Sequence, residues 1–185
     1  MSPVELRALL GELERHAPGE RLHGERVAVH SVATAHHLGM PEEELLQIRF
    51  AAALHDVGKL DLPADLLSRF GRISGADVLA LRTHAALGAA RFDGRFSEWI
   101  GAHHERWDGN GYPAGLVGEA IPVGARIIAV AETYDVLVNE NRWRTPLNED
   151  QALDEIQRCA GTQFDSEVVN AFLAVQSLIQ PLNWE

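Results

Sequence analysis

Two adjacent histidines, His103 and His104, begin the segment with the clearest chemical potential, residues 103–113 (HHERWDGNGYP). The apolar residues 99–102 precede this segment, and its own glycines and proline prevent a helix from continuing through it. Neighbouring side chains on a helix point about 100° apart, so both imidazoles reach one target only where the helix ends or the target is broad. A pair or cluster of metal ions is such a target, and we therefore expect further ligands elsewhere in the chain.

His55 and Asp56 form a second pair of adjacent ligand types, again at the end of an apolar stretch. An aspartate can offer one oxygen to each of two metals, while imidazoles complete each coordination shell. Nitrogen and oxygen ligands without thiolate suit manganese, iron or another octahedral divalent ion better than structural zinc. For this pair alone, the alternative is a histidine stabilised by the dipole at a helix C-terminus, beside a solvated aspartate.

His84 and His23 are weaker candidates on their own, because a lone histidine on a helix is more often packed or exposed than functional. His30 lies two turns from His23 on the same face of one expected helix, so its role stays open.

Glu132 and Asp135 lie one turn apart on an otherwise apolar helix, where a buried carboxylate is costly unless a cation meets it. Both carboxylates could instead pair with Arg126 or Lys59. Arg126 is six residues from Glu132 on the same helix, which is a poor spacing for contact.

The bulk composition bounds the class of protein. The chain has 185 residues, of which 46% are hydrophobic, enough for one domain with a substantial core. A formal net charge of −11 argues against a general nucleic-acid surface. No apolar run approaches the roughly 20 residues of a membrane span, and no signal pattern begins the chain, so we expect a cytoplasmic protein without a membrane partner. The single cysteine excludes an internal disulfide and a multi-cysteine zinc site.

Helical periodicity and capping signals run through nearly the whole sequence, and strictly alternating runs that indicate strands are absent, so we expect an all-α fold. A connection containing Pro63 is expected between the third and fourth helices. The expected helices cover 2–16, 20–38, 41–54, a stretch that begins after Ser74 and carries His84, a stretch from about 97 that delivers His103 and His104, 122–137, and two last helices capped by Asn148 and Asp165.

Taken in order, these residues resemble the HD-GYP family, the phosphodiesterase branch of the HD metal-dependent phosphohydrolase superfamily. The resemblance runs from about residue 21 to 173, and its motifs are highly specific in combination. They are residues 23–27 (HGERV), 54–59 (LHDVGK), Thr83-His84 with Gly88, 103–113, Ile121-Pro122 with 125–127, and Phe164-Asp165. We therefore expect a single HD-GYP-like domain over 1–185, with an N-terminal helix over 1–19, a core over 20–175 and no attached sensor domain.

The resemblance implies an HD-superfamily helical bundle around a di-metal centre that holds two divalent ions, iron or manganese first among them. The implied ligands are His23, His55, Asp56, His84, His103, His104 and Glu132. Asp56 would bridge the two ions. His23 and Glu132 would complete the coordination shell of one ion, and His84, His103 and His104 would complete that of the other.

Two positions depart from the family's metal site. The family usually has aspartate at the position of Glu132, and a glutamate reaches about one bond further while still able to ligate. Members with a third ion use a glutamate one turn before the first histidine. That position is Gly19 here, with Glu20 one residue away, so we expect two ions.

The family hydrolyses cyclic di-GMP, a bacterial second messenger, to the linear dinucleotide and often on to GMP. The resemblance therefore implies attack by a metal-bridging hydroxide, with Asp56 and Lys59 as catalytic residues and Lys59 neutralising charge on the phosphate. Gly111, Tyr112 and Pro113 would shape the substrate pocket. The same loop is implicated in docking partner signalling domains, so a diguanylate cyclase or an adaptor domain is an expected partner.

Substrate contacts after the helix that carries Glu132 also depart from the family. The family's Arg-Pro-Tyr-Arg/Lys stretch reads NRWR at 141–144 here. Asn141 replaces the first arginine, a contact to substrate phosphate, while Arg144 keeps the last position and Arg142 could substitute after a small rotation.

Two other functions stay open. The first is a non-catalytic or weakly active signalling module that binds a partner or a cyclic dinucleotide, which the departures at Glu132 and Asn141 would favour. The presence of every histidine ligand and of Lys59 argues against it, because a docking module has no physical need of them. The second is an HD phosphohydrolase for another nucleotide, against which the Gly-Tyr-Pro signature argues.

Overall fold

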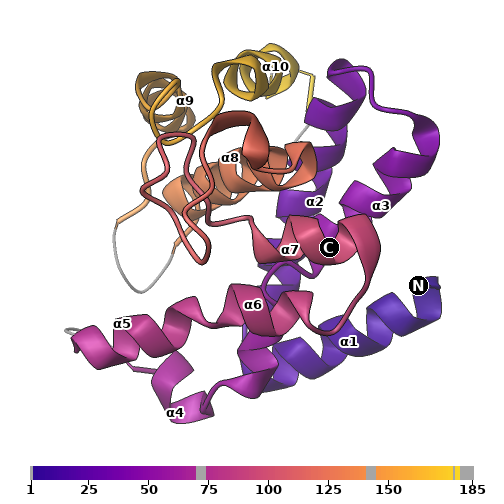
Figure 1. The fold of residues 1–185 in the computed structure, drawn as a ribbon, viewed down its shortest axis with the longest axis vertical. Helices are drawn as coiled ribbons and strands as arrows, with labels where there is room; N and C mark the ends of the chain where they lie inside the picture. The colour runs from indigo at the N-terminus through magenta and orange to yellow at the C-terminus, as the bar shows by residue number, and fades with distance from the viewer. Residues whose placement is uncertain (1, 70–73, 141–144, 177, 180–185) are drawn as a thin grey trace.

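The computed structural model describes residues 2–69, 74–140, 145–176 and 178–179, and helices joined by turns and loops make up these ranges (Figure 1). The elements in chain order are α1 (Pro3–His16), α2 (Glu20–His37), α3 (Glu42–Ala53), the 3-10 helix η1 (Val57–Asp61), α4 (Ala64–Leu67), α5 (Gly75–Arg82), α6 (His84–Ala89), α7 (Gly94–Gly101), the 3-10 helix η2 (Gly118–Ala120), α8 (Val123–Val138), α9 (Glu149–Arg158) and α10 (Ser166–Gln176).

The expected all-α class is confirmed. The described residues contain one isolated β-bridge, between Ala160 and Phe164, and no strand. The connection expected around Pro63 is itself partly helical, because η1 and α4 occupy it. Within the described ranges, no helix combines the length and the apolar composition that crossing a bilayer requires.

Capping boxes fix several helix starts. Ser2, Ser74 and Asn148 each accept a hydrogen bond from the backbone N–H three residues on, and the side chain there accepts one from the cap's own N–H. Both bonds satisfy donors that a helix N-terminus otherwise leaves free. The starts predicted at these three positions are therefore confirmed.

The core lies between α2, α3 and α8, with α10 packed over α2 and α8 (Figure 1). Val27, Ile48 and Ile127 are fully buried there, and each such side chain contributes about 1.5–3 kcal/mol of stability. Gly24 allows α2 to approach α3 closely, because a Cβ at this position would lie 2.4 Å from the carbonyl oxygen of Ala53. This close approach sets the start of α2 beside the end of α3, where the first predicted ligands lie.

The single helix expected from Ser74 through His84 is wrong, because the chain breaks at Thr83. The Thr83 N–H donates to the carbonyl of Ala80 at 3.1 Å, and its hydroxyl donates to the same oxygen at 2.6 Å. These three-residue bonds interrupt the α-helical ladder, so His84 begins a new helix, α6. There the backbone packs against Gly58, whose Cβ, if present, would lie 2.0 Å from the His84 carbonyl oxygen.

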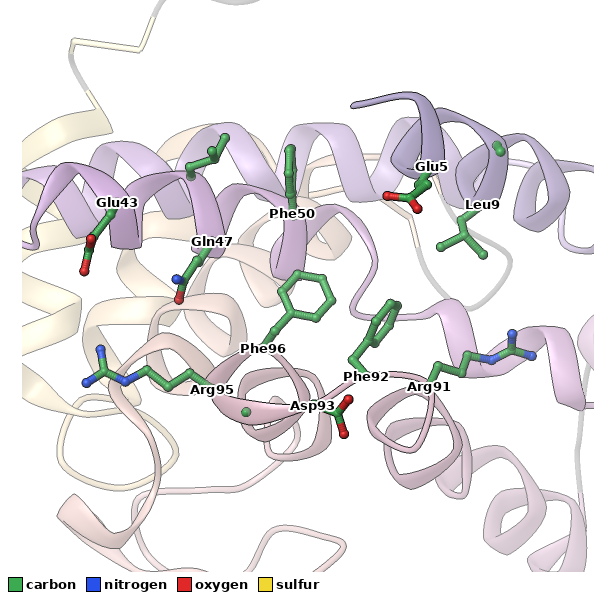
Figure 2. Close-up of a pocket in the computed structure, with 13 residues that line it drawn as sticks. Glu5, Leu9, Glu43, Gln47, Phe50, Arg91, Phe92, Asp93, Arg95 and Phe96 are labelled. Carbon is green, nitrogen blue, oxygen red and sulfur yellow. The ribbon is translucent and has the colours of Figure 1, made fainter. Parts of the chain in front are cut away.

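A wide groove of about 1200 Å³ lies between α1, α3 and the segment that leads into α7 (Figure 2). Leu9, Leu46, Phe50, Phe92 and Phe96 supply its apolar lining. We call it the α1–α3 groove. Its lining contains none of the predicted metal ligands.

Candidate metal centre and substrate pocket

The predicted ligands come from the ends of several helices and from the middle of α8. His23 lies in the first turn of α2, His55 and Asp56 follow α3, and His84 begins α6. The pair at 103–104 follows α7 in a turn, as expected for adjacent imidazoles that must converge. Among the described residues, four overlapping groups have potential ligand atoms within 4.8 Å of one another. Two of these groups share no residue and together contain six of the seven predicted ligands: His23, His55 and Glu132, and His84, His103 and His104.

The Asp56 carboxylate lies between the two groups. Its Oδ1 is 3.1 Å from Nε2 of His84, while its Oδ2 is 3.3 Å from Nε2 of His55 and 3.9 Å from Nε2 of His23. Each oxygen therefore faces a different group. This is the geometry that a bridging carboxylate requires.

Three of the histidines are held in one orientation by the same device. Nδ1 of His55, His84 and His103 bonds to the backbone carbonyl three residues earlier, at 2.7, 2.6 and 2.5 Å. Since only a protonated Nδ1 can donate to a carbonyl, this bond places the proton of a neutral ring on Nδ1 and points Nε2 at the cluster. The carbonyls belong to the last turns of α3, α5 and α7, where a helix has no partner of its own for them.

Pairs of Nε2 atoms approach one another closely. The separation is 3.2 Å for His23 and His55, 3.2 Å for His84 and His103, and 3.1 Å for His104 and His84. Two unprotonated nitrogens repel at this distance unless a proton or a metal ion lies between them. Adjacent ligands of an octahedral ion with bonds of about 2.1 Å lie about 3.0 Å apart. The donor set and its spacing thus fit divalent metal ions.

The protonation states also suit metal binding. Burial lowers the pKa of His103 and His104, which keeps both imidazoles neutral. Burial raises the pKa of Asp56, but Lys59 and His55 outweigh it and hold that pKa well below its usual range. For His55, burial lowers the pKa, but the Asp56 carboxylate prevails and raises it to about 9. A metal ion that binds at His55 therefore displaces a proton.

Asp135 orients His23 from outside the cluster. Its Oδ2 accepts a hydrogen bond from Nδ1 of His23 at 2.7 Å, and Arg26 donates to both carboxylate oxygens at 2.5 and 2.8 Å. Arg126, considered from sequence as a partner of this acid, instead pairs with Asp165 at 2.7 Å. Arg26 and Asp135 are 109 residues apart along the chain, so their pairing could not be predicted from the sequence.

Lys59 joins Asp56 to Glu20. Its ammonium donates to Asp56 Oδ2 at 2.7 Å and to Glu20 Oε1 at 2.8 Å. Glu20 also forms a group of potential ligands with His23 and Asp56. In the sequence it lies one residue after Gly19, the position at which the family's third-ion glutamate was expected. Its Oε2 is buried without a hydrogen-bond partner, and burial raises the pKa of this carboxyl.

Glu105 anchors the Gly-Tyr-Pro loop, a role that the sequence reading missed. Its buried carboxylate accepts hydrogen bonds from the backbone N–H groups of residues 114, 115 and 116, at 2.7 to 3.1 Å. Gly111 packs against the same turn, since a Cβ there would lie 2.3 Å from the Arg106 nitrogen. The only sequence signal for this role is an acid directly after the histidine pair.

A pocket of about 410 Å³ opens beside the cluster, and we call it the metal-side pocket. Its lining includes Arg82, His103, His104, Tyr112, Glu132 and Val136. Of the predicted substrate contacts, Gly111 and Tyr112 line it, Pro113 follows in the same loop, and Lys59 contacts Asp56. Asn141, Arg142 and Arg144 lie outside the described residues.

His30, left open by the sequence, lies away from the cluster. Its ring packs against Tyr134 at 5.1 Å and Phe172 at 5.8 Å, and burial lowers its pKa. It is therefore a neutral core residue.

Comparison with known proteins places this geometry in a family. A family model described as HD domain matches residues 9–168. The chain belongs to the HD domain family. Among its HD domain relatives, a "Cyclic di-GMP phosphodiesterase" of Thermotoga maritima is 35% identical over 165 residues, which cover 85% of this chain and 45% of that protein. A "3'3'-cGAMP-specific phosphodiesterase 2" of Vibrio cholerae is 32% identical over 158 residues, covering 82% of this chain and 30% of that protein.

The chain thus spans less than half the length of these curated relatives. Their names confirm the expected resemblance to HD-GYP phosphodiesterases. A solved HDG"Y"P protein from Bdellovibrio bacteriovorus has the same fold, with a TM-score of 0.69, 22% sequence identity, and coverage of 85% of this chain and 52% of that one.

Proposed function

We propose that this chain is a metal-dependent phosphodiesterase that hydrolyses cyclic di-GMP to the linear dinucleotide, to GMP or to both. One observation carries the proposal: two groups of three ligands face the two oxygens of Asp56, beside a pocket of about 410 Å³. The names of the Thermotoga maritima and Vibrio cholerae relatives support a cyclic dinucleotide as the substrate class. Cyclic GMP-AMP is the nearest alternative within that class. A bacterial second messenger as substrate would also place the reaction in the cytoplasm.

The proposal assigns two divalent ions, iron or manganese first, to the two groups of ligands. His23, His55 and Glu132 would hold one ion, the three histidines at 84, 103 and 104 the other, and Asp56 would contact both. When bound, two such ions would supply an activated water and hold the phosphodiester for in-line attack. The fixed orientations of the histidine rings and the ionised state of Asp56 prepare the donors in advance.

Lys59 would neutralise negative charge on the substrate phosphate. An ammonium has three N–H donors, and the two carboxylates that contact it, Glu20 and Asp56, use two of them. The third donor remains for the phosphate. Burial lowers the pKa of Lys59, but the two carboxylates prevail and raise it, so the side chain stays charged during turnover.

The number of ions is part of the proposal. Glu20 contributes to a third group of potential ligands with His23 and Asp56, but the ammonium of Lys59 lies between Glu20 and Asp56. A cation already neutralises these carboxylates, which supports two ions. Metal analysis of purified protein should give two ions per chain. Three ions, reduced to two in Glu20→Gln, would overturn this part of the proposal.

The Gly-Tyr-Pro loop is the proposed docking site for a diguanylate cyclase or an adaptor domain. Glu105 holds the loop rigid, and Val117 near its end is 60% exposed. Val117 therefore offers an exposed side chain at which a substitution can probe this surface. In titration calorimetry with such a cyclase domain, Val117→Asp should weaken binding and leave turnover unchanged. Unchanged binding would remove this surface.

The proposed activity is tested by chromatography of products. Protein purified anaerobically and loaded with Fe(II) or Mn(II) is incubated with cyclic di-GMP and, in parallel, with 3'3'-cGAMP, with Asp56→Ala as the control. Linear dinucleotide or GMP that is absent from the control supports the enzyme. Faster hydrolysis of 3'3'-cGAMP would keep the reaction and change the substrate.

A second candidate is the non-catalytic signalling module, favoured by glutamate at position 132 and by Asn141 in place of an arginine. A metal-loaded sample that binds cyclic di-GMP without forming product would establish it. If neither cyclic dinucleotide is bound or cleaved, the third function, an HD phosphohydrolase for another nucleotide, should be tested with linear nucleotides.

A further inference from the structure

Arg82, the last residue of α5, lies at the metal-side pocket in a defined stack of side chains. The carbon of its guanidinium is 4.9 Å from the centroid of the Tyr112 ring. The same ring stacks on His104, with centroids 4.7 Å apart and an interplanar angle of 27°. The cation is thus one aromatic ring away from a predicted metal ligand.

The charge of Arg82 is not neutralised by a nearby acid. Two arginines line the metal-side pocket. Arg106 donates two hydrogen bonds to the Asp108 carboxylate, at 3.0 and 2.7 Å, so its charge has a partner. Among the described residues, Arg82 has no carboxylate oxygen within 4.0 Å and contacts the face of Tyr112 instead. A guanidinium without an ion pair, at the edge of a pocket, is available to an anionic ligand.

The proposed substrate needs such a cation. A cyclic dinucleotide carries two phosphodiester groups, each with one negative charge, and the metal centre can act on only one at a time. The chain has a formal net charge of −11, and the arginine that the family uses for phosphate is replaced by Asn141. The loss of this arginine leaves a place for a further positive group at the second phosphate, in addition to Arg142 and Arg144.

We propose that Arg82 binds the phosphodiester that is not being cleaved. This inference rests on the proposed function, since it presupposes a cyclic dinucleotide. The guanidinium offers paired N–H donors that match two phosphate oxygens. The Tyr112 face holds it in place through a cation–π contact, which reduces the conformational freedom lost when the substrate binds.

The test compares Arg82→Gln with Arg49→Gln. Arg49 is exposed on α3 and lines a different part of the surface, so its variant makes the same charge change away from the pocket. For cyclic di-GMP, Arg82→Gln should raise KM about tenfold, the size expected for a lost charge-assisted contact, with kcat and metal content near wild type. Arg82→Lys, which keeps the charge without the paired donors, should give an intermediate KM. Arg49→Gln should match wild type.

Three outcomes would overturn the inference. A KM for Arg82→Gln within twofold of that for Arg49→Gln removes Arg82 from binding. A loss that is large for cyclic di-GMP and small for 3'3'-cGAMP assigns Arg82 to a guanine edge, because both substrates have the same phosphates. If the wild type has no activity, the proposed hydrolysis is refuted, but a role of Arg82 in binding is still open. Calorimetric titration with cyclic di-GMP then tests that role. Equal affinities of wild type and Arg82→Gln, or no binding by either, would then reject it.

Discussion

The α1–α3 groove and the metal-side pocket differ in size and in how their polar groups are satisfied. The groove, at about 1200 Å³, is nearly three times as large as the pocket, at about 410 Å³. The two arginines that line the groove both have acidic partners, since Arg91 pairs with Asp61 and Arg95 with Glu44. In the pocket, by contrast, neighbouring imidazole nitrogens face one another at about 3.1–3.2 Å.

This contrast shows why volume alone is a poor guide to a reactive site. Polar groups that satisfy one another need no ligand, whereas lone pairs aimed at a common point remain unfavourable until a cation arrives. We therefore expect chemistry at the smaller pocket, where the converging ligand atoms do not satisfy one another. The predictions below test this difference between the two regions, from the largest effect to the smallest.

Asp56→Ala or His55→Ala should abolish both metal binding and turnover. Asp56 places one oxygen 3.1 Å from Nε2 of His84 and the other 3.3 Å from Nε2 of His55. Metal content is measured by elemental analysis and turnover by product chromatography on the same samples. Unchanged metal content in either variant would refute the assignment of these two residues as ligands.

Lys59→Ala should retain metal and lower turnover about a hundredfold, the usual cost of removing one preorganised group that stabilises charge in the transition state. Lys59→Arg is the matched control, because it keeps a positive charge beside Asp56 and Glu20. The rates of both variants are compared at equal metal content. A Lys59→Ala variant as fast as wild type would remove this residue from the mechanism.

Asp135→Ala should weaken metal binding about tenfold, as expected when the partner that orients a ligand is lost. His23 would lose the bond that fixes its Nδ1 proton, and Arg26 would lose its partner. Metal affinity is measured by competition with a chromogenic chelator. Asp135→Asn, which can still accept from His23, should lie closer to wild type. Equal affinities for all three proteins would leave Asp135 with a structural role only.

Phe92→Ala in the α1–α3 groove should leave turnover within about twofold of wild type, while lowering the free energy of unfolding by about 1–2 kcal/mol because a half-buried ring is lost. Denaturant titration and the product assay test both effects. A large loss of turnover at unchanged stability would mean that the groove communicates with the metal centre, and the contrast between the regions would fail.

Much of the fold and of the candidate site follows from the sequence. The start of a helix is determined by residues close together in the sequence. The capping side chains of Ser2, Ser74 and Asn148 therefore predict three of the starts. The two adjacent pairs, at 55–56 and 103–104, are recognisable because ligand types stand together where apolar helices end, and the structure brings them together.

The features that could not be predicted from the sequence depend on contacts between distant residues or on local changes in hydrogen bonding. Asp135 meets Arg26 only through the packing of α8 on α2, which no local pattern encodes. The break at Thr83 depends on the two hydrogen bonds that Thr83 donates to the Ala80 carbonyl. Neither residue type signals the end of a helix in the sequence. Glu20 enters the cluster although its position along the chain argues against it.

The bonds from His55, His84 and His103 to the last carbonyls of α3, α5 and α7 have a consequence for dynamics. Helix ends fray at low free-energy cost, far below that of global unfolding. Here each end is closed by a ring whose opposite nitrogen faces the cluster, so unwinding the last turn and releasing a ligand are one event. If these histidines hold metal ions as proposed, metal exchange would proceed by local opening at a single helix end while the core between α2, α3 and α8 stays folded.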